Sequence, residues 1–372
     1  MSLKIGVTGG NGFLGYHIIN TIKYTIPDFK LIDLQRNSFN SNKKIDEFTS
    51  ACDIIIHLAA VNRDLEKSKI MSVNIELAKN LISSIKRTSF SGKLIFSSST
   101  QEGNKTEYGE SKKIANELFY ESSIKFGFTY FGLLIPNIFG PFCKPHYNSF
   151  ISTFCYNIHN SIKPKIIKDN SVKLIHVSNV VNYIIQLFKE NESKVIDIPH
   201  DKELTVSNTL ARLNEFNKIY ISNYSFPDFK SSFDIHLFNT FRSYLNLEKH
   251  FPKPHHKNSD ERGFFTEIVR AKTQGQFSYS ITNSGFTRGN HFHTRKIERF
   301  SVIEGSALIE LRKIGDNKIY SFVLSGENPS FVDMPVWYTH NIKNISDNPL
   351  TTLFWINEPY NEEDPDTFYE NV

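Results

Sequence analysis

The first half of the chain alternates between short apolar runs of strand type and longer segments of helical type. The longer segments predict helices at residues 16–26 and 74–86 and a further helix that carries Tyr108. The apolar runs predict strands at residues 3–7, 30–34, 53–57 and 93–96. Strands that alternate with helices are typical of a parallel sheet covered by helices on both faces. We therefore predict a doubly wound α/β fold for the N-terminal part.

The last third of the chain changes to short strands separated by turns rich in Gly, Asn and Asp. Such regular spacing favours a sandwich or small barrel. The predicted strands cover residues 277–282, 298–303, 307–312, 319–324 and 350–356. Between the two patterns, residues 247–259 contain two prolines and no periodicity, which predicts a linker with solvated histidines. The sequence thus predicts domains at 1–246 and 260–372.

Length and composition fit this organisation. A chain of 372 residues is long enough for two hydrophobic cores, and its net charge of +4 is dispersed, so no nucleic-acid partner is expected. The three cysteines, Cys52, Cys143 and Cys155, lie in apolar surroundings without metal-type spacing, which predicts buried thiols in a reducing compartment. The chain begins directly with a strand, and no apolar run reaches membrane-spanning length. We expect a soluble cytoplasmic protein with no membrane contact.

A glycine-rich stretch joins the first predicted strand to the first predicted helix. Glycines at this point allow a tight turn, and the helix N-terminus can bind a pyrophosphate. The position between a strand and a helix predicts a dinucleotide-binding loop. The candidate cofactor-binding residues of the loop are Gly9, Asn11, Gly12, Phe13, Leu14 and Gly15.

The next strands supply further cofactor candidates. Asp33 lies where a carboxylate would bind the adenosine ribose of NAD, whereas Arg36 could bind the 2′-phosphate of NADP. The two residues favour opposite cofactors, and we favour NADPH because Arg36 has no other evident role. Leu58, Ala59 and Ala60 follow the next strand, and small residues there would let the backbone pass close to the cofactor.

Tyr108 and Lys112 are four residues apart and therefore share one face of a predicted helix. An ammonium group beside the phenol can lower its pKa, and the phenol can exchange a proton with a substrate oxygen. The pair follows a strand that ends in a run of serines, within the array that starts with the dinucleotide loop. This context predicts a catalytic pair.

The C-terminal part contains a candidate metal site. His291 and His293 are two residues apart, so in a strand both imidazoles point to one face, and Glu298 can join them after a turn. With His340 as the fourth member, the set has the ligand types that zinc or another divalent metal prefers. The metal would keep an open position for water or substrate.

The N-terminal pattern over about residues 1–245 resembles the extended short-chain dehydrogenase/reductase family. The resemblance implies a catalytic triad of Ser99, Tyr108 and Lys112, with Thr100 as the alternative hydroxyl. It also implies that the Ile135–Pro141 loop, which contains Asn137, lies where substrate and nicotinamide meet. Asn148 would line a nucleotide-sugar site, although a plain core helix is nearly as compatible with that segment.

The C-terminal motifs resemble those of cupin barrels. The spacing of Gly285, His291, His293, Glu298 and Gly305 matches the first cupin motif, and residues 335–344 are similar to the second. Trp337 stands where that second motif has glycine, so the turn there must differ or be strained. Residues 260–267 are similar to a stretch of the sugar-nucleotide 3,5-epimerases, which implies that Arg262 meets the nucleotide diphosphate. Alternatively, Arg262 pairs with Asp260 or Glu267.

The combination of both halves resembles the bifunctional capsule and O-antigen enzymes that make UDP-2-acetamido-2,6-dideoxy-L-talose. This resemblance implies a UDP-activated 4-keto-6-deoxy-N-acetylhexosamine as substrate, C3 epimerisation in the cupin, C4 reduction in the first domain, and a homodimer. Lys296, Glu267, Tyr338 and a metal-bound hydroxide are equally able to act as the C3 base. Two alternatives are a non-catalytic cupin attached to a reductase and a first domain that is a C4 epimerase.

Overall fold

The computed structural model describes residues 2–34, 36–63 and 66–372, without the side chains of residues 36, 37, 67 and 68. The chain forms two compact units. Unit 1 comprises Met1–Phe139, His146–Ser149 and Asn170–Thr205, and unit 2 comprises Gly140–Pro145, Phe150–Asp169 and Val206–Val372. Each unit is described by itself.

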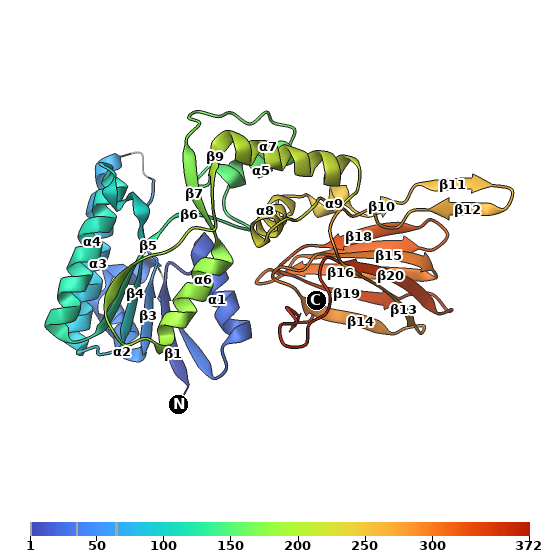
Figure 1. Ribbon diagram of the computed structural model, residues 1–372. Coiled ribbons are helices and arrows are strands. Elements are labelled where there is room, and N and C mark those ends of the chain that lie inside the picture. Colours follow the sequence, from blue (N-terminus) through green and yellow to red (C-terminus); the bar gives the residue numbers. More distant parts are fainter. Residues whose placement is uncertain (1, 35, 64–65) are drawn as a thin grey trace. The chain divides into compact units, whose positions relative to one another are not determined.

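Unit 1 is built on a six-stranded sheet in which every pairing is parallel (Figure 1). In spatial order its strands are β2 (Phe29–Asp33), β1 (Leu3–Thr8), β3 (Ile54–His57), β4 (Lys93–Ser99), β5 (Thr129–Ile135) and β8 (Lys194–Asp197). The order reverses at β1, which has β2 on one side and β3 on the other. In such sheets ligands bind beyond the carboxyl ends of the strands at this switch point. The predicted parallel sheet is confirmed.

Helices cover both faces of this sheet (Figure 1). On one face α1 (Phe13–Thr25) and α6 (Val177–Gln186) contribute Ile18, Ile22 and Val180 to an apolar core. The other face is covered by α2 (Asn42–Ala51), α3 (Lys67–Thr88) and α4 (Glu107–Phe126), which share a second core. A smaller sheet contains β6 (Asn137–Phe139), β7 (Ser171–His176) and β9 (Lys202–Thr205), and the short helices are η1 (Arg36–Asn40), η2 (Thr100–Gly103) and η3 (Leu187–Lys189).

Unit 2 contains two five-stranded antiparallel sheets. One has the order β10 (Lys253–Pro254), β18 (Ser330–Met334), β15 (Glu298–Glu304), β20 (Leu350–Ile356), β13 (Gln276–Thr282). The other has the order β17 (Ile319–Ser325), β16 (Ser306–Lys313), β19 (Tyr338–Asn344), β14 (Thr287–Phe292), β21 (Phe368–Tyr369). Side chains of both sheets share one apolar core, including Val302 from the first and Ile309 from the second. The predicted β-rich C-terminal part is confirmed, and closure into a barrel stays a prediction.

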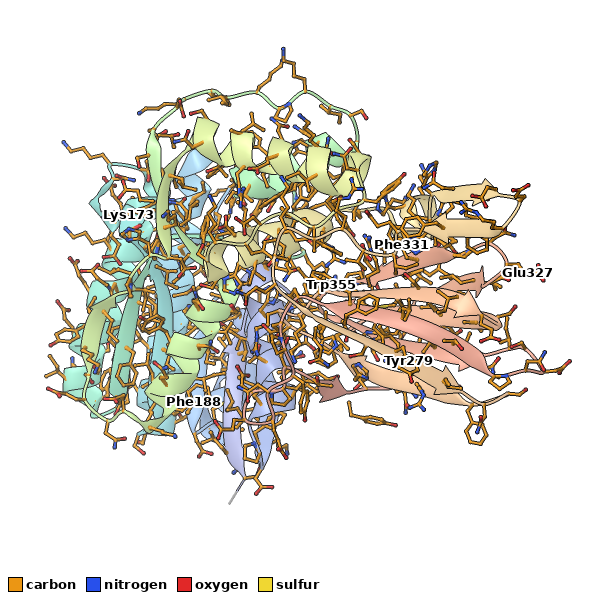
Figure 2. All side chains as sticks on the ribbon, turned by 45° about the vertical axis from the view of Figure 1, so that its right-hand side comes forward. Lys173, Phe188, Tyr279, Glu327, Phe331 and Trp355 are labelled. Atoms are coloured by element: carbon orange, nitrogen blue, oxygen red, sulfur yellow. The ribbon has the colours of Figure 1, made fainter. Side chains whose placement is uncertain are left out.

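Unit 2 also contains three longer helices and the π-helix η4 (Asn217–Ser222). The longer helices are α5 (Phe150–His159), α7 (Val206–Phe216) and α8 (Ser232–Arg242). A buried ion pair lies within the first sheet, where Arg299 of β15 donates to both oxygens of Asp333 of β18, at 2.7 and 2.9 Å. Tyr220 of η4 also donates to Asp333, at 2.8 Å. Phe331 and Trp355, which are labelled in Figure 2, complete the aromatic surroundings: the Arg299 guanidinium lies 3.7 Å from the ring centroid of Phe331.

The segment predicted as a linker is folded. It contains α9 (Leu247–His250) and β10, and Leu247 and Phe251 are buried in the core of unit 2. Within it, His255 is also buried, and its Nε2 lies 3.0 Å from the Ser301 hydroxyl. Isolated apolar residues between charged ones gave no periodicity, which is why the sequence did not indicate burial. The following hairpin consists of β11 (Lys257–Asp260) and β12 (Gly263–Thr266).

Two sequence predictions concern the whole chain. Cys52, Cys143 and Cys155 are free and buried, as predicted. Among the residues that the structure describes, no helix is long and apolar enough to cross a membrane.

Candidate functional site

The glycine loop lies at the switch point of the parallel sheet, between β1 and α1. Gly9 has a φ of +72°, and a Cβ atom there would lie 2.8 Å from the backbone nitrogen of Ala59. A side chain at Gly15 would collide with the carbonyl oxygens of Gly9 and Gly10. These positions therefore require glycine, and α1 begins directly after Gly12 with its first amide groups at the switch point.

A buried histidine ties the glycine loop to the loop after β3. The Thr8 hydroxyl lies 2.8 Å from His57 Nδ1 and accepts hydrogen bonds from the amides of Leu58 and Ala59, both at 3.2 Å. Burial lowers the pKa of His57 to about 3, so the ring is neutral. Because the Thr8 oxygen already accepts from the amides, its proton is directed to Nδ1. The sequence prediction did not include this contact, which fixes two of the candidate cofactor-binding loops together.

The two residues with opposite cofactor preferences lie after β2. Asp33 is the last residue of β2 and is exposed, beside the end of β1. The side chain of Arg36 lies outside the described residues. The choice between NAD and NADP stays a prediction.

The predicted triad residues come from β4 and from the first turns of α4. Lys112 is buried, and its Nζ donates to the carbonyl oxygen of Ser97 at 2.6 Å. The same ammonium lies 5.8 Å from the Tyr108 ring centroid. Ser99 ends β4, and its hydroxyl accepts from the amide of Gln101 at 3.1 Å.

The electrostatics of the pair differ from the sequence prediction. Burial, and then the neighbouring Tyr147, raise the pKa of Tyr108 to about 12. Burial also lowers the pKa of Lys112 to about 7, which weakens its ability to stabilise a phenolate. Desolvation therefore outweighs the expected effect of Lys112 on the phenol. A neutral phenol near pH 7 is a proton donor, which suits the protonation of a reduced carbonyl oxygen.

A polar network that the sequence did not predict lies behind the pair. Glu102 is hydrogen-bonded to the Ser98 hydroxyl and accepts from Asn116 Nδ2 at 3.1 Å. The Tyr130 hydroxyl donates to the Asn116 side chain at 2.6 Å. Burial raises the pKa of Glu102 despite these hydrogen bonds. Ser98 and Glu102 are four residues apart, but Asn116 and Tyr130 are more distant and no motif joins them, so the sequence alone does not indicate the network.

The candidate substrate residues lie at exposed positions. Asn137 begins β6, and Asn148 lies in a turn just before α5. Arg262 lies in the β11–β12 turn, where its guanidinium forms an ion pair with Asp260 at 2.5 Å. This pairing matches the alternative that the sequence left open for Arg262. The substrate roles of all three residues stay predictions.

The four predicted metal ligands come together in unit 2. Their ligand atoms all lie within 4.8 Å of one another. His291 of β14 is the register partner of His340 of β19. Glu298 begins β15, and its Oε2 lies 3.1 Å from Nε2 of His293 and 3.1 Å from Nε2 of His340.

The hydrogen-bond pattern of the cluster fits a metal ion. The His293 and His340 Nε2 atoms and Glu298 Oε2 are buried and, apart from one another, have no hydrogen-bond partner among the described residues. The other ring nitrogens face carbonyl oxygens: His293 Nδ1 contacts Asp366 at 2.5 Å, and His340 Nδ1 contacts Tyr338 at 3.3 Å. Carbonyls accept protons, so Nδ1 carries the proton and Nε2 has a free lone pair. Buried polar atoms rarely stay unpaired, and a divalent cation would satisfy all of them.

The predicted metal ligands shift one another's pKa values. Burial favours a neutral Glu298, but His293 and His340 hold its pKa well below the ordinary value. Burial, and then the neighbouring His340 and His293, lower the pKa of His291 to about 4. Burial opposes a charged His293, but Glu298 raises the pKa of this ring, so a metal that binds it must displace a proton when the ring is charged.

Trp337 occupies the turn where the cupin motif has glycine. Its φ is +63°, so it adopts the left-handed conformation that glycine would take. The Trp337 amide donates to the carbonyl of His293 at 2.7 Å, and its ring stacks on Phe292. These contacts hold a strained turn beside the cluster, in agreement with the prediction of strain.

Comparisons with known proteins agree with this two-part organisation. Residues 5–198 match the family model "NAD dependent epimerase/dehydratase family", and residues 258–368 match "Polysaccharide biosynthesis C-terminal domain". The chain is 29% identical over 371 residues, 98% of each protein, to a UDP-2-acetamido-2,6-beta-L-arabino-hexul-4-ose reductase from Pseudomonas aeruginosa. It is 27% identical to the spore coat polysaccharide biosynthesis protein SpsL from Bacillus subtilis over 122 residues, 30% of this chain and 80% of SpsL.

A solved structure resembles the whole chain. The crystal structure of the capsular polysaccharide assembling protein CapF from Staphylococcus aureus has a TM-score of 0.64 and 29% identity, and the match covers 100% of both chains. Similarity therefore extends over both parts of the molecule.

Proposed function

Because the chain belongs to the NAD dependent epimerase/dehydratase family over residues 5–198, we propose that it is a bifunctional nucleotide-sugar enzyme. Its substrate is a UDP-activated 4-keto-6-deoxy-N-acetylhexosamine. The C-terminal site epimerises C3, and the N-terminal site then reduces the C4 ketone with NADPH. The product is UDP-2-acetamido-2,6-dideoxy-L-talose, a precursor of UDP-N-acetyl-L-fucosamine in capsule or O-antigen synthesis. The enzyme works in the cytoplasm as a homodimer.

The observation that carries the proposal is the unpaired buried cluster in unit 2. His293 Nε2, His340 Nε2 and Glu298 Oε2 converge in a chain whose other unit has a dinucleotide-type loop with a Tyr-Lys pair. Similarity along the whole chain to a protein named as a reductase of a UDP-4-keto sugar supports the substrate class. A reductase alone would not need the cluster.

In the reduction, the bound NADPH supplies a hydride to C4. Tyr108 donates its phenolic proton to the oxygen of the former ketone; its raised pKa keeps the phenol protonated but makes it a weaker acid. Ser99, at the end of β4, holds the ketone oxygen. Lys112 is anchored on the Ser97 carbonyl and binds the nicotinamide ribose. The glycine loop and the Leu58–Ala60 backbone bind the dinucleotide.

In the epimerisation, the hydrogen at C3 is acidic because the adjacent ketone delocalises the resulting carbanion. His291, His293, Glu298 and His340 would hold a divalent metal, with zinc the best match to these ligands. Such an ion supplies charge stabilisation to a developing enolate oxygen. Arg262 binds the diphosphate after it leaves its ion pair with Asp260.

The candidate C3 bases have different surroundings. Lys296 is buried, and its Nζ donates to the carbonyl of Pro365 at 2.6 Å. Glu267 is exposed and forms an ion pair with Arg270 at 2.9 Å. Burial, and then the neighbouring Tyr320, raise the pKa of Tyr338, which disfavours it as a base. We assign the base to none of them.

The reduction is tested by stoichiometry. With the UDP-4-keto sugar, we expect one NADPH to be oxidised for each ketone lost, as measured by absorbance at the nicotinamide band and by NMR of the product. A C4 epimerase would regenerate its cofactor. Turnover without net NADPH oxidation would refute the reductase assignment.

The epimerisation is tested by the stereochemistry of the product. Wild type with NADPH should give the C3-inverted sugar, whereas a His291→Ala/His293→Ala variant should give a reduced sugar with the original C3 configuration. NMR coupling constants distinguish the two. If both proteins give the same product, the cupin is a non-catalytic module.

A further inference from the structure

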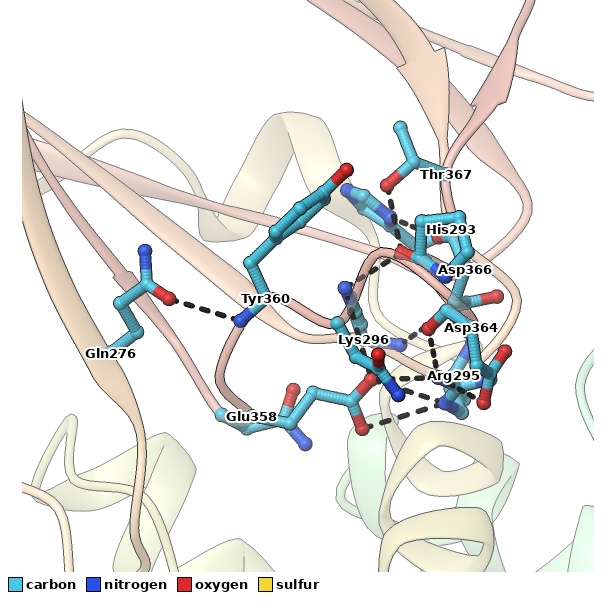
Figure 3. Close-up of polar contacts among 12 residues, drawn as sticks. Gln276, His293, Arg295, Lys296, Glu358, Tyr360, Asp364, Asp366 and Thr367 are labelled. Carbon is cyan, nitrogen blue, oxygen red and sulfur yellow. Dashed lines mark hydrogen bonds and ion pairs between the residues drawn. The ribbon is translucent and has the colours of Figure 1, made fainter.

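The last residues of the chain lie beside the four predicted metal ligands. We call residues 364–371 the C-terminal strap. Within it, β21 pairs with β14, so that Tyr369 lies opposite His291 and Phe368 opposite Phe292. The strap therefore runs beside the two histidines of the His-x-His motif, and Figure 3 shows the polar contacts between this part of the chain and residues 293–296.

In the strap, both carboxylate oxygens of Asp366 accept hydrogen bonds. It is buried, with 4% of its surface exposed, and its φ is +40°. Its Oδ1 accepts from the amide and hydroxyl of Thr294, at 3.0 and 2.6 Å. Its Oδ2 accepts from the amides of Arg295 and Lys296, at 2.9 and 3.0 Å. One carboxylate thus fixes the three residues that follow His293 in the turn before Glu298.

The backbone of Asp366 contacts the metal ligand itself. Its carbonyl oxygen accepts from His293 Nδ1 at 2.5 Å. This bond fixes the ring with Nε2 toward Glu298, 3.1 Å away. A ligand histidine needs its second nitrogen bonded in this way to keep one tautomer and one orientation. A left-handed, non-glycine residue at this point agrees with backbone geometry that the surroundings impose.

Charged residues of the same turn hold the strap in place. Lys296 Nζ donates to the Pro365 carbonyl at 2.6 Å, immediately before Asp366. Arg295 pairs with Asp364 at 2.9 Å and with Glu358 at 3.0 Å, as the dashed lines in Figure 3 indicate. Every one of these contacts joins residues 293–296 to residues at the end of the chain. The strap and the turn therefore form one structural element.

We propose that Asp366 is the positioning residue of the metal site: its carbonyl selects the metal-binding tautomer of His293, and its carboxylate holds the turn that presents His293 and Glu298. The inference rests on the proposed function, since it requires that the cluster bind a metal. Asp366 contacts no substrate or metal in this role. It acts through His293 and the turn.

The test uses the full chain stripped of metal and titrated with Zn²⁺ or Co²⁺ against a competing chelator. Asp366→Ala removes the four hydrogen bonds that the carboxylate accepts. Asp366→Asn keeps the side-chain shape but places an NH₂ group, which cannot accept, opposite two hydrogen-bond donors. Asp364→Asn is the matched control, because it removes a charge from the same strap without touching His293 or the turn amides. His293→Ala gives the Zn²⁺ affinity of a cluster that lacks the His293 side chain.

We expect both Asp366 variants to bind Zn²⁺ about 10- to 100-fold more weakly, the effect typical of second-sphere losses, with Asp364→Asn unchanged. The Co²⁺ absorption spectrum at saturation should also change, because without the carboxylate bonds the strap no longer holds the Asp366 carbonyl against His293. Circular dichroism and tryptophan fluorescence of the metal-free variants show whether they are folded, and Asp366→Asn serves if Asp366→Ala is not. A purely structural role would lower thermal stability and leave the saturated spectrum as in wild type.

Wild-type affinity and a wild-type cobalt spectrum in Asp366→Asn and Asp366→Ala would overturn the proposal while leaving the metal site intact. Equal metal binding by wild type and His293→Ala would instead refute the metal site, and the positioning role with it. A shift of the imidazole ¹⁵N resonances of His293 in metal-free Asp366→Ala would support the tautomer assignment directly.

Discussion

Loss of the Asp333 charge should destabilise unit 2 far more than loss of an exposed charge. Asp333 is fully buried and accepts three hydrogen bonds, two from Arg299 and one from Tyr220. In Asp333→Asn the Arg299 guanidinium stays buried without its counter-charge. Breaking a buried ion pair in this way costs about 3–5 kcal/mol. With a urea m-value of about 2 kcal/mol per molar, the midpoint should fall by about 1.5–2.5 M.

The two tryptophans make this measurement specific. The chain has two tryptophans, Trp337 and Trp355, and both are buried in unit 2. Tryptophan fluorescence during urea unfolding therefore follows unit 2, even if unit 1 unfolds separately. Asp260→Asn is the matched control, since it also removes a carboxylate paired with an arginine, at an exposed site of unit 2. Exposed ion pairs contribute little to stability.

A second variant separates charge from packing. Adding Arg299→Met to Asp333→Asn removes the unpaired guanidinium, so part of the lost stability should return. A midpoint for Asp333→Asn equal to that of Asp260→Asn would refute the reasoning. It would mean that the stability of unit 2 does not depend on this pair.

Three further predictions concern the two sites. Tyr108→Phe should lower the rate of NADPH oxidation by about 10²- to 10⁴-fold in a spectrophotometric assay, whereas Tyr120→Phe, an exposed tyrosine of the same helix, should leave it unchanged. Glu298→Gln should weaken Zn²⁺ binding in a chelator competition by more than about 100-fold, beyond second-sphere losses, and Glu304→Gln at the other end of β15 should not. The pKa of Lys112 is about 7 in the folded state and roughly 10.4 unfolded, so the unfolded chain binds more protons between these values. Wild-type stability should therefore rise between pH 7 and 9 relative to Lys112→Met, by up to about 1.4 kcal/mol per pH unit in urea unfolding followed by circular dichroism, and a constant difference would contradict a depressed pKa.

Local patterns were sufficient to predict much of this molecule. The glycine loop, the Tyr108–Lys112 pair and the His-x-His motif depend on short spacings. The structure places the first two on the kind of element predicted, whereas β14 ends at Phe292, so His291 lies in the strand and His293 directly follows it. His340 joined the metal ligands through a motif of its own, and strand register then brought it opposite His291. Geometry of this kind can be predicted because it depends on the spacing of a few neighbouring residues.

Features that depend on distant contacts were not predictable. Asp366 lies 73 residues after His293 and belongs to no motif, so its role is visible in the folded chain alone. Helix α8 belongs to unit 2, although the sequence pattern placed it with the first domain, and its Arg242 donates to the carbonyl of Met334 of β18 at 3.1 Å, a contact between residues far apart in the sequence. The direction of the Tyr108 pKa shift also failed, because burial cannot be inferred from a four-residue spacing.

The central claim, that the cluster in unit 2 activates C3 before any reduction, is tested most directly by hydrogen exchange. The protein is incubated with a UDP-4-keto-6-deoxy-N-acetylhexosamine in deuterated water without NADPH, and C3 is followed by NMR and mass spectrometry. We expect deuterium at C3 with wild type and with Tyr108→Phe, and none above background with His291→Ala/His293→Ala. Wild type that leaves C3 protonated, or a double variant that exchanges as fast as wild type, would contradict the account.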